Sequence, residues 1–192
     1  EPEGLESVWD NLPELSPCLI EGILRKGHKM LIAGPSKAGK SFLQIELCIA
    51  IAEGKKWLKW YCAQGRVMYV NLELDRTSCL HRFKDVYAAM GIVPNNLQNI
   101  DIWNLRGKSV PMDKLAPKLI RRAAKKDYVA IIIDPIYKVI TGDENSADQI
   151  SKIETTAERY RPFFSYLISL RASFFFLSCP ANALLSAPRR FK

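Results

Sequence analysis

The chain has 192 residues, 48% apolar and 25% charged, which is typical of one soluble globular domain with its own core. Its formal net charge is +8, and none of its apolar runs approaches the roughly 20 residues that a membrane-spanning helix requires. The acidic first residues lack the pattern of an export signal, and the five cysteines form no C-x-x-C pair. We therefore expect a cytoplasmic protein with reduced thiols and no membrane partner.

The first predicted elements surround a glycine-rich loop. Residues 1–27 contain three prolines and little periodicity, and we interpret them as a lead-in segment. Residues 29–33 (K-M-L-I-A) form a short apolar run that predicts a buried strand. Residues 41–53 are apolar on most sides and predict a well-buried helix that ends at Gly54.

Aromatic and basic residues mix in the loop predicted after this helix. Trp57, Trp60 and Tyr61 stand among three lysines, a combination that can stack on nucleic-acid bases. Packing of the aromatic rings against the edge of the sheet is the interpretation that we favour.

Strands and helices then alternate along the chain. The expected strands are 66–72, 100–105 and 128–133, and the expected helices are 76–90 and 112–126. Gly91 closes the first of these helices, and Pro117 is expected to interrupt the second, basic helix early. The last strand is apolar throughout, as a central parallel strand should be. The alternation predicts an α/β fold with a mostly parallel central sheet and right-handed crossovers.

Three more segments are predicted towards the C-terminus. They are a polar, flexible loop at 141–145, a helix at 149–171 that Pro162 breaks, and a strand at 174–177 (F-F-F-L). We therefore expect a core domain over residues 28–179, followed by a basic tail at 180–192. From Gln149 onward, seven basic residues against two acidic ones fit nucleic-acid binding, and fit a solvated face equally well.

The loop after the first strand carries a complete phosphate-binding motif. It fits G-x-x-x-x-G-K-[ST] at every fixed position, with a predicted strand before it and a predicted helix after it. Its residues are Gly34, Pro35, Ser36, Lys37, Ala38, Gly39, Lys40 and Ser41. Glycines allow the tight turn that directs backbone N–H groups at phosphates, and the helix adds the positive end of its dipole. Lys40 would reach the β- and γ-phosphates and Ser41 would ligate Mg²⁺, so the loop predicts binding of Mg-ATP.

Two carboxylates are candidates for the rest of the site. Asp134 ends an apolar strand, the Walker B arrangement, and is expected to hold Mg²⁺ directly or through water; a turn aspartate is the alternative. No glutamate follows it, so the group that positions or deprotonates the attacking water must come from elsewhere. Glu73, at the end of the second predicted strand, is that candidate, and a surface carboxylate is its alternative. Asp75 is expected to cap the following helix.

A glutamate on the earlier strand, with an aspartate alone on the later one, is the RecA-like pattern. The sequence resembles the RepA-type subgroup of RecA-like AAA ATPases, whose namesakes are hexameric plasmid replicative helicases. The resemblance covers roughly residues 9–148. Its motifs are residues 19–27 (L-I-E-G-I-L-R-K-G), 31–42 (L-I-A-G-P-S-K-A-G-K-S-F), 67–73 (V-M-Y-V-N-L-E) and 131–137 (I-I-I-D-P-I-Y).

This resemblance implies a three-layer RecA-like P-loop NTPase fold, a homo-oligomeric ring and action on single-stranded DNA. Residue by residue, it implies that Glu73 and Lys40 are catalytic and that Ser41 and Asp134 bind the metal. The residues that it places beside the nucleotide, in addition to the loop, are Phe42 and Arg82; for Arg82, a helix-surface arginine is the alternative. Family members carry a histidine-containing sensor after the next strand, where this chain has serine and cysteine, so the C-terminal part is expected to be divergent or truncated.

Three functions fit these patterns. The first is an ATPase that acts on DNA in plasmid or mobile-element replication or recombination. The second is a nucleotide-dependent binding module or switch with little hydrolysis, which the absent sensor histidine favours. The third is a small P-loop kinase, for which Arg159 and Arg161 are the only trace of an arginine-rich lid.

Overall fold

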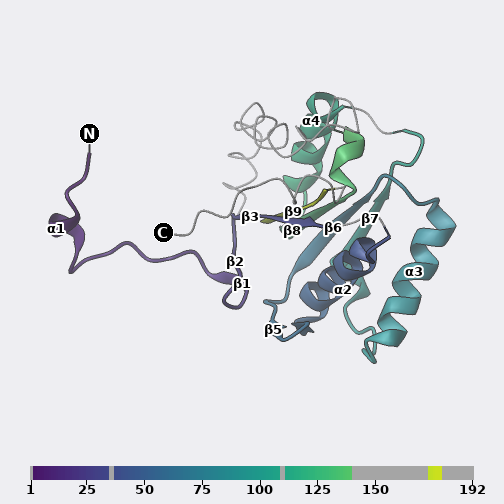
Figure 1. Cartoon of the computed structure of the whole chain (residues 1–192), viewed down its shortest axis with the longest axis horizontal. Coiled ribbons are helices and arrows are strands. Elements are labelled where there is room, and N and C mark those ends of the chain that lie inside the picture. The colour runs from purple at the N-terminus through teal and green to yellow at the C-terminus, as the bar shows by residue number, and fades with distance from the viewer. Residues whose placement is uncertain (1, 35–36, 109–110, 140–172, 179–192) are drawn as a thin grey trace.

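The computed structural model describes residues 2–34, 37–108, 111–139 and 173–178. Within them, five parallel strands form one central sheet in the order β3-β9-β8-β6-β7 (Figure 1). Their bounds are β3 Lys29–Ala33, β6 Arg66–Asn71, β7 Ile100–Asn104, β8 Tyr128–Asp134 and β9 Ser173–Ser178. Each strand lies within one residue of its predicted bounds, and the parallel sheet confirms the predicted α/β class. The predicted burial of the strand at 29–33 is wrong: every residue of β3 is exposed or half-buried, because β3 stands at the edge of the described sheet.

Helices cover both faces of this sheet, which gives the predicted three layers (Figure 1). Helices α2 (Lys40–Glu53) and α3 (Arg76–Ala89) lie on one face, and α4 (Met112–Ala123) lies on the other. Successive residues of a strand point to opposite faces, so β6 serves two cores. Val67 and Tyr69 join the core under α2 and α3, whereas Met68 and Val70 join the core under α4. Strands buried on both faces have to be apolar throughout, which explains their pattern.

The ends of α2 and α3 are defined by local residues. Gly39 precedes α2 with φ 80°, and Gly54 ends the helix with φ 63°, both in the left-handed region that glycine adopts without strain. Asp75 precedes α3, and its carboxylate accepts a hydrogen bond from the backbone N–H of Ser78 at 2.9 Å. The predicted cap at Asp75 is therefore confirmed. Short 3-10 helices also occur at Leu97–Asn99 and Ile136–Val139.

Pro117 lies inside α4 and does not interrupt it, contrary to the prediction. A proline in a helix interior lacks the N–H that would donate to the carbonyl four residues before it. Leu115, Ala116 and Leu119 are at most 4% exposed and hold this part of the helix in the second core. Tertiary packing therefore outweighs the missing hydrogen bond.

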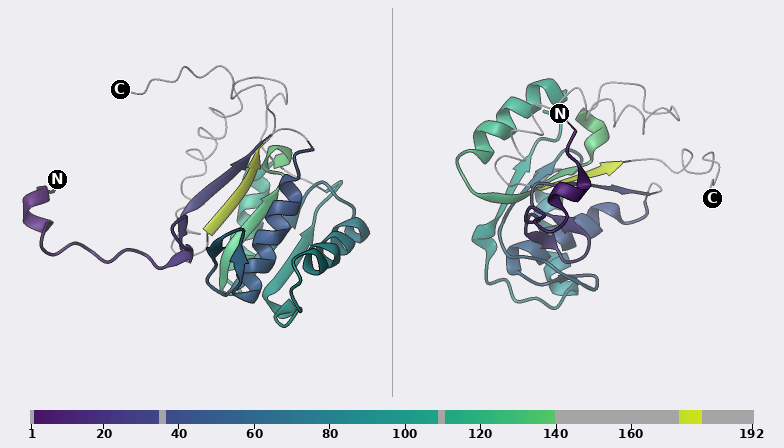
Figure 2. Two further views of the ribbon diagram at one scale, coloured as in Figure 1. Left: turned by 60° about the horizontal axis from the view of Figure 1, so that its bottom comes forward. Right: turned by 90° about the vertical axis from the view of Figure 1, so that its left-hand side faces the viewer.

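The predicted lead-in segment contains structure of its own. Helix α1 (Leu5–Val8) and the residues after it extend away from the sheet (Figure 2). Strands β1 (Cys18–Ile20) and β2 (Leu24–Arg25) then form an antiparallel hairpin. Leu19 and Ile20 are fully buried in the first core, so the packed unit begins before residue 28.

The predicted aromatic loop after α2 is instead a second hairpin. It consists of β4 (Lys56–Trp57) and β5 (Trp60–Tyr61). Trp57 is 5% exposed, and its indole N–H donates to the carbonyl of Leu43 at 3.1 Å. Packing is therefore the role that the structure shows for this ring.

Several predictions lie outside the described residues. They are the placement of Pro35 and Ser36, the loop at 141–145, the helix at 149–171 and the tail at 180–192. Among the described helices, none has both the length and the apolar character needed to cross a membrane.

Candidate functional site

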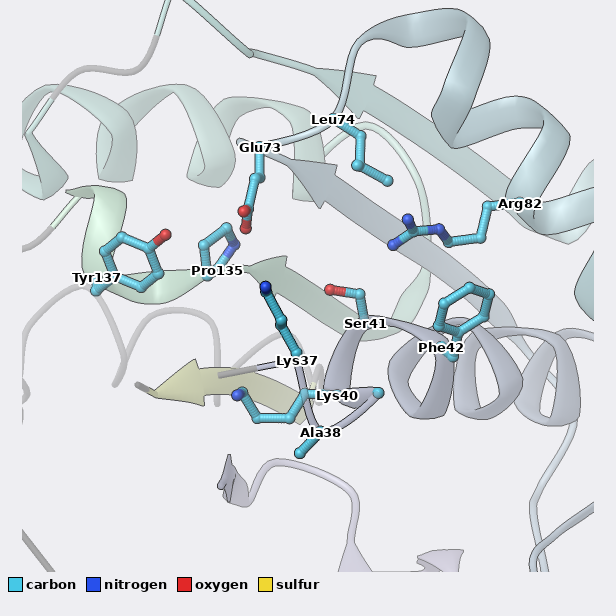
Figure 3. Close-up of a pocket in the computed structure, with 11 residues that line it drawn as sticks. Lys37, Ala38, Lys40, Ser41, Phe42, Glu73, Leu74, Arg82, Pro135 and Tyr137 are labelled. Atoms are coloured by element: carbon cyan, nitrogen blue, oxygen red, sulfur yellow. The ribbon is translucent and has the colours of Figure 1, made fainter. Parts of the chain in front are cut away.

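A cleft of about 400 Å³ opens where the parallel strands end (Figure 3). Since all the strands run in one direction, the segments that follow β3, β6 and β8 meet at a single edge of the sheet. The lining residues come from these segments and from α2 and α3. They are Lys37, Ala38, Gly39, Lys40, Ser41, Phe42, Glu73, Leu74, Arg82, Pro135 and Tyr137.

The loop between β3 and α2 forms one wall of the cleft. Lys37 and Gly39 have φ values of 62° and 80°, and left-handed residues in such turns build the backbone concavities that bind anions. Lys37 is not a glycine, so its conformation is strained, as is common at ligand sites. The Lys40 ammonium donates to the carbonyl of Gly34 at 2.8 Å, which joins the two ends of the loop. A positive charge and a helix N-terminus thus face the same cleft.

Asp134 lies beside this loop, because the register of the sheet brings the end of β8 to α2. It is 3% exposed, and its Oδ1 accepts a hydrogen bond from the Ser41 hydroxyl at 3.3 Å. Its other oxygen, Oδ2, accepts a hydrogen bond from the Tyr69 hydroxyl. Both oxygens of the carboxylate are therefore oriented by named donors.

Burial raises the pKa of Asp134 above its ordinary value. The hydrogen bonds from Tyr69 and Ser41 and the positive charge of Arg82 oppose this rise, while the negative charge of Glu73 adds to it. Burial also raises the pKa of Tyr69, and the Asp134 carboxylate raises it further, so the tyrosine hydroxyl stays protonated and is the donor. A cation beside Asp134 would favour its charged form.

The oxygen donors at this point suit Mg²⁺. Mg²⁺ prefers carboxylate and hydroxyl oxygens, and neighbouring ligands of an octahedral ion with bonds of about 2.1 Å lie about 3 Å apart. The separation of 3.3 Å between Ser41 Oγ and Asp134 Oδ1 is compatible with that spacing. Where the chain is described, no group of three His, Cys, Asp or Glu side chains could hold a metal ion alone. A site with one carboxylate is compatible with Mg²⁺ that takes its other ligands from nucleotide phosphates and water.

Glu73 lies on the rim of the cleft and points into it (Figure 3). Its place is set by Asn71, which ends β6 and is 1% exposed. The Asn71 side-chain oxygen accepts from the backbone N–H groups of Glu73 and Leu74 at 3.3 and 2.9 Å. The Asn71 amide donates to the carbonyl of Leu74 at 2.7 Å and to the side chain of Asn104 at 2.8 Å. One buried amide thus shapes the turn that presents Glu73.

Arg82 and Phe42 form the opposite end of the cleft. The Arg82 guanidinium lies over the Phe42 ring, 4.4 Å from its centroid, in a cation–π contact. Phe42 is 45% exposed, so a flat apolar surface and a positive charge are both accessible there. The structure therefore brings together every described residue that the sequence predicted for the site.

Five residues of the site were not predicted. Pro135, Tyr137 and Leu74 line the cleft, whereas Tyr69 bonds to the carboxylate of Asp134 and Asn71 bonds to the backbone N–H of Glu73. Tyr69 and Asn71 carried a signal, because after Arg66 at its start the strand is otherwise apolar, and buried polar groups need partners.

A glycine-rich loop between a strand and a helix, with an aspartate ending a neighbouring parallel strand, defines a P-loop nucleotide-binding protein with a RecA-like fold. The comparison with known families agrees. A family model described as an AAA domain matches residues 7–162, so the chain belongs to this family of AAA/P-loop ATPases. A search of curated proteins finds no match.

Proposed function

We propose that the protein is a Mg-ATP hydrolase of the RepA/RecA-like type that acts on DNA in plasmid or mobile-element replication or recombination. The observation that carries the proposal is the meeting of three segments at one cleft. The loop with Lys40 and Ser41, the buried Asp134 and the rim residue Glu73 come from separate parts of the chain.

The binding step uses the loop and the start of α2. Backbone N–H groups of residues 37–41 bind the phosphates, and the Lys40 ammonium contributes its charge to the β- and γ-phosphates. Ser41 and Asp134 would hold Mg²⁺, and the ion would supply charge that neutralises the phosphate oxygens. Phe42 and Arg82 lie where they would contact the bound nucleotide.

The chemical step uses Glu73. It is the one carboxylate among the described residues that line the cleft, and it faces the phosphate loop across the cleft (Figure 3). A carboxylate in this place orients the attacking water and accepts its proton. Catalysis of phosphoryl transfer consists mostly of such positioning together with charge stabilisation, so few side chains are needed.

Single-stranded DNA is the proposed effector, and a ring of identical subunits is the proposed assembly. The resemblance to RepA-type ATPases supports both, and the net charge of +8 favours a polyanionic partner. The combination predicts an ATPase whose turnover depends on DNA.

The experiment is steady-state ATP turnover by the protein in Mg²⁺, with and without single-stranded DNA. We expect Mg²⁺-dependent hydrolysis that DNA stimulates, and loss of nucleotide binding in Lys40→Ala. Lys59→Ala serves as the matched control, because Lys59 lies on the β4–β5 hairpin and not in the cleft. Hydrolysis that DNA does not change would contradict the DNA role, and binding that survives in Lys40→Ala would contradict the site.

A nucleotide-dependent switch with little hydrolysis is the second candidate. Strand β9 lies between β3 and β8 and ends at Ser178, where RepA-type proteins are expected to carry a histidine sensor. ATP binding without turnover in the wild-type protein, unchanged in Glu73→Gln, would favour the switch.

A further inference from the structure

Tyr69 makes a contact that none of the motifs explains. Its hydroxyl donates to Oδ2 of Asp134 from the neighbouring strand β6. The residue is fully buried, and its ring meets the ring of Phe83 edge-on, with centroids 5.1 Å apart and an interplanar angle of 89°. A tyrosine in such a place has one position for its hydroxyl oxygen, because its ring is fixed by packing.

The register of the sheet explains why this tyrosine reaches Asp134. Asn71 pairs with Asp134 in β8, so Tyr69 lies two residues before that pair on the same face of the sheet. This face is covered by α2, which carries Ser41. Tyr69 and Ser41 therefore approach the two oxygens of one carboxylate, Oδ2 and Oδ1, from different elements.

The contact constrains a torsion that is otherwise soft. The terminal torsion of an aspartate is broad, so a buried carboxylate without partners samples many orientations. With Oδ2 held by Tyr69, Oδ1 is directed at the Ser41 hydroxyl and at the cleft. Groups that orient a metal ligand in this way typically change metal affinity about 10- to 100-fold when they are removed.

We infer that Tyr69 is a positioning residue that sets the Mg²⁺ affinity of the nucleotide site by holding Asp134 in its ligating orientation. The inference rests on the proposed Mg-ATP site. It concerns binding of the metal with nucleotide, and it requires no contact between Tyr69 and the substrate.

The fold contains a matched pair for comparison. The Tyr87 hydroxyl donates to Oε1 of Glu53 at 3.0 Å, and both residues are at most 7% exposed. Neither of them lines the cleft. Tyr69→Phe and Tyr87→Phe each delete one hydroxyl from a buried tyrosine–carboxylate pair, so a merely structural role would give the same result in both.

The test is a Mg²⁺ titration of nucleotide binding, followed by the fluorescence of a labelled ATP analogue. We expect Tyr69→Phe to raise the Mg²⁺ concentration at half-saturation about 10-fold, with unchanged affinity for the analogue in EDTA. Tyr87→Phe should lower the melting temperature and leave the Mg²⁺ midpoint at its wild-type value. In an Asp134→Ala background, Tyr69→Phe should produce no further shift, because the ligand that it orients is gone.

The outcomes distinguish a failure of the Tyr69 inference from a failure of the proposed Mg-ATP site on which it rests. Wild-type protein that binds the analogue equally with and without Mg²⁺ would overturn both. A Mg²⁺-dependent wild type with an unshifted Tyr69→Phe, or an equal shift in Tyr87→Phe, would overturn the inference alone. Should Tyr69→Phe fail to fold, Phe83→Leu loosens the Tyr69 ring without removing its hydroxyl, and its Mg²⁺ midpoint must then rise for the inference to stand.

Discussion

The Ser41 hydroxyl donates to Oδ1 of Asp134 at 3.3 Å, although the two residues lie 93 positions apart in the chain. Ser41 stands in the first turn of α2, after β3, whereas Asp134 ends β8. Strand β9 lies between β3 and β8 in the sheet. Helix α2 follows β3 in the chain but packs on β8 and β6, so the contact joins the phosphate loop directly to the buried carboxylate.

Removal of the Ser41 hydroxyl should weaken the Mg²⁺-dependent part of nucleotide binding. Because the hydroxyl is a proposed Mg²⁺ ligand, Ser41→Ala should weaken nucleotide binding in Mg²⁺ by about 10-fold, whereas Ser41→Thr keeps the ligand and should bind as the wild type does. Isothermal titration calorimetry with ATP in Mg²⁺ and in EDTA measures the difference. Equal affinity of Ser41→Ala and Ser41→Thr in Mg²⁺ would speak against a ligating role.

Replacement of Glu73 by glutamine should separate hydrolysis from binding. The amide keeps the shape of the side chain but cannot accept a proton, so turnover should fall about 100-fold or more while ATP affinity is retained. Glu21→Gln is the control, because Glu21 is an exposed residue of the β1–β2 turn outside the cleft. Measured turnover in Glu73→Gln close to that of Glu21→Gln would exclude Glu73 as the catalytic carboxylate.

Replacement of Asn71 by alanine should affect both stability and catalysis. The variant leaves the N–H groups of Glu73 and Leu74 without their acceptor, so we expect a loss of about 2 kcal/mol in the free energy of unfolding. The turn that presents Glu73 should also loosen, which lowers the turnover number. Urea unfolding and ATP turnover measure the two effects.

Asn99→Ala provides the comparison for Asn71. It removes a single hydrogen bond, from the Asn99 amide to the carbonyl of Ala52 at 3.1 Å, at a distance from the cleft in the fold. Its turnover number should equal that of the wild type. A folded Asn71→Ala with normal turnover would show that the turn does not depend on this amide.

Glu53 should make stability depend on pH. It is 6% exposed and accepts hydrogen bonds from the Tyr87 hydroxyl, the N–H groups of Asn95 and Asn96, and the Asn96 amide. Burial raises the pKa of Glu53, but the hydrogen bonds from Asn96, Tyr87 and Asn95 outweigh it, so the net pKa is lowered. A lowered pKa in the folded state stabilises the protein above the unfolded value of about 4.3. This stabilisation is lost as the pH falls through the lower, folded pKa.

Glu53→Gln tests this dependence. At pH 7 the amide cannot satisfy so many donors, so the variant should lose about 2 kcal/mol of unfolding free energy. As the pH falls through the lowered pKa of the folded state, the wild-type carboxylate becomes neutral as well, and the two proteins should converge. Urea unfolding across this range measures the difference, and a gap that stays constant with pH would contradict the argument.

Much of the fold was predictable because its signals are local. The strands at 66–71 and 128–134 are largely apolar runs, and such runs are required where both faces of a sheet are covered. The strand at 29–33 was also found from its apolar run, although its residues are exposed or half-buried. The hairpins at β1–β2 and β4–β5 escaped prediction, because strands of two or three residues have no measurable periodicity. The continuity of α4 through Pro117 escaped it as well, since burial and not helix propensity decides that case.

By itself, the sequence determined the phosphate loop and the residue types that its chemistry requires, because that motif is contained within one strand, one turn and one helix. Only the tertiary structure decided which residues surround the loop. The order β3-β9-β8-β6-β7 places Asp134 beside Ser41, and the register of β6 against β8 places Tyr69 beneath Asp134. These pairings depend on where strands distant in the chain meet, and a buried polar group finds its partner only once that order is set.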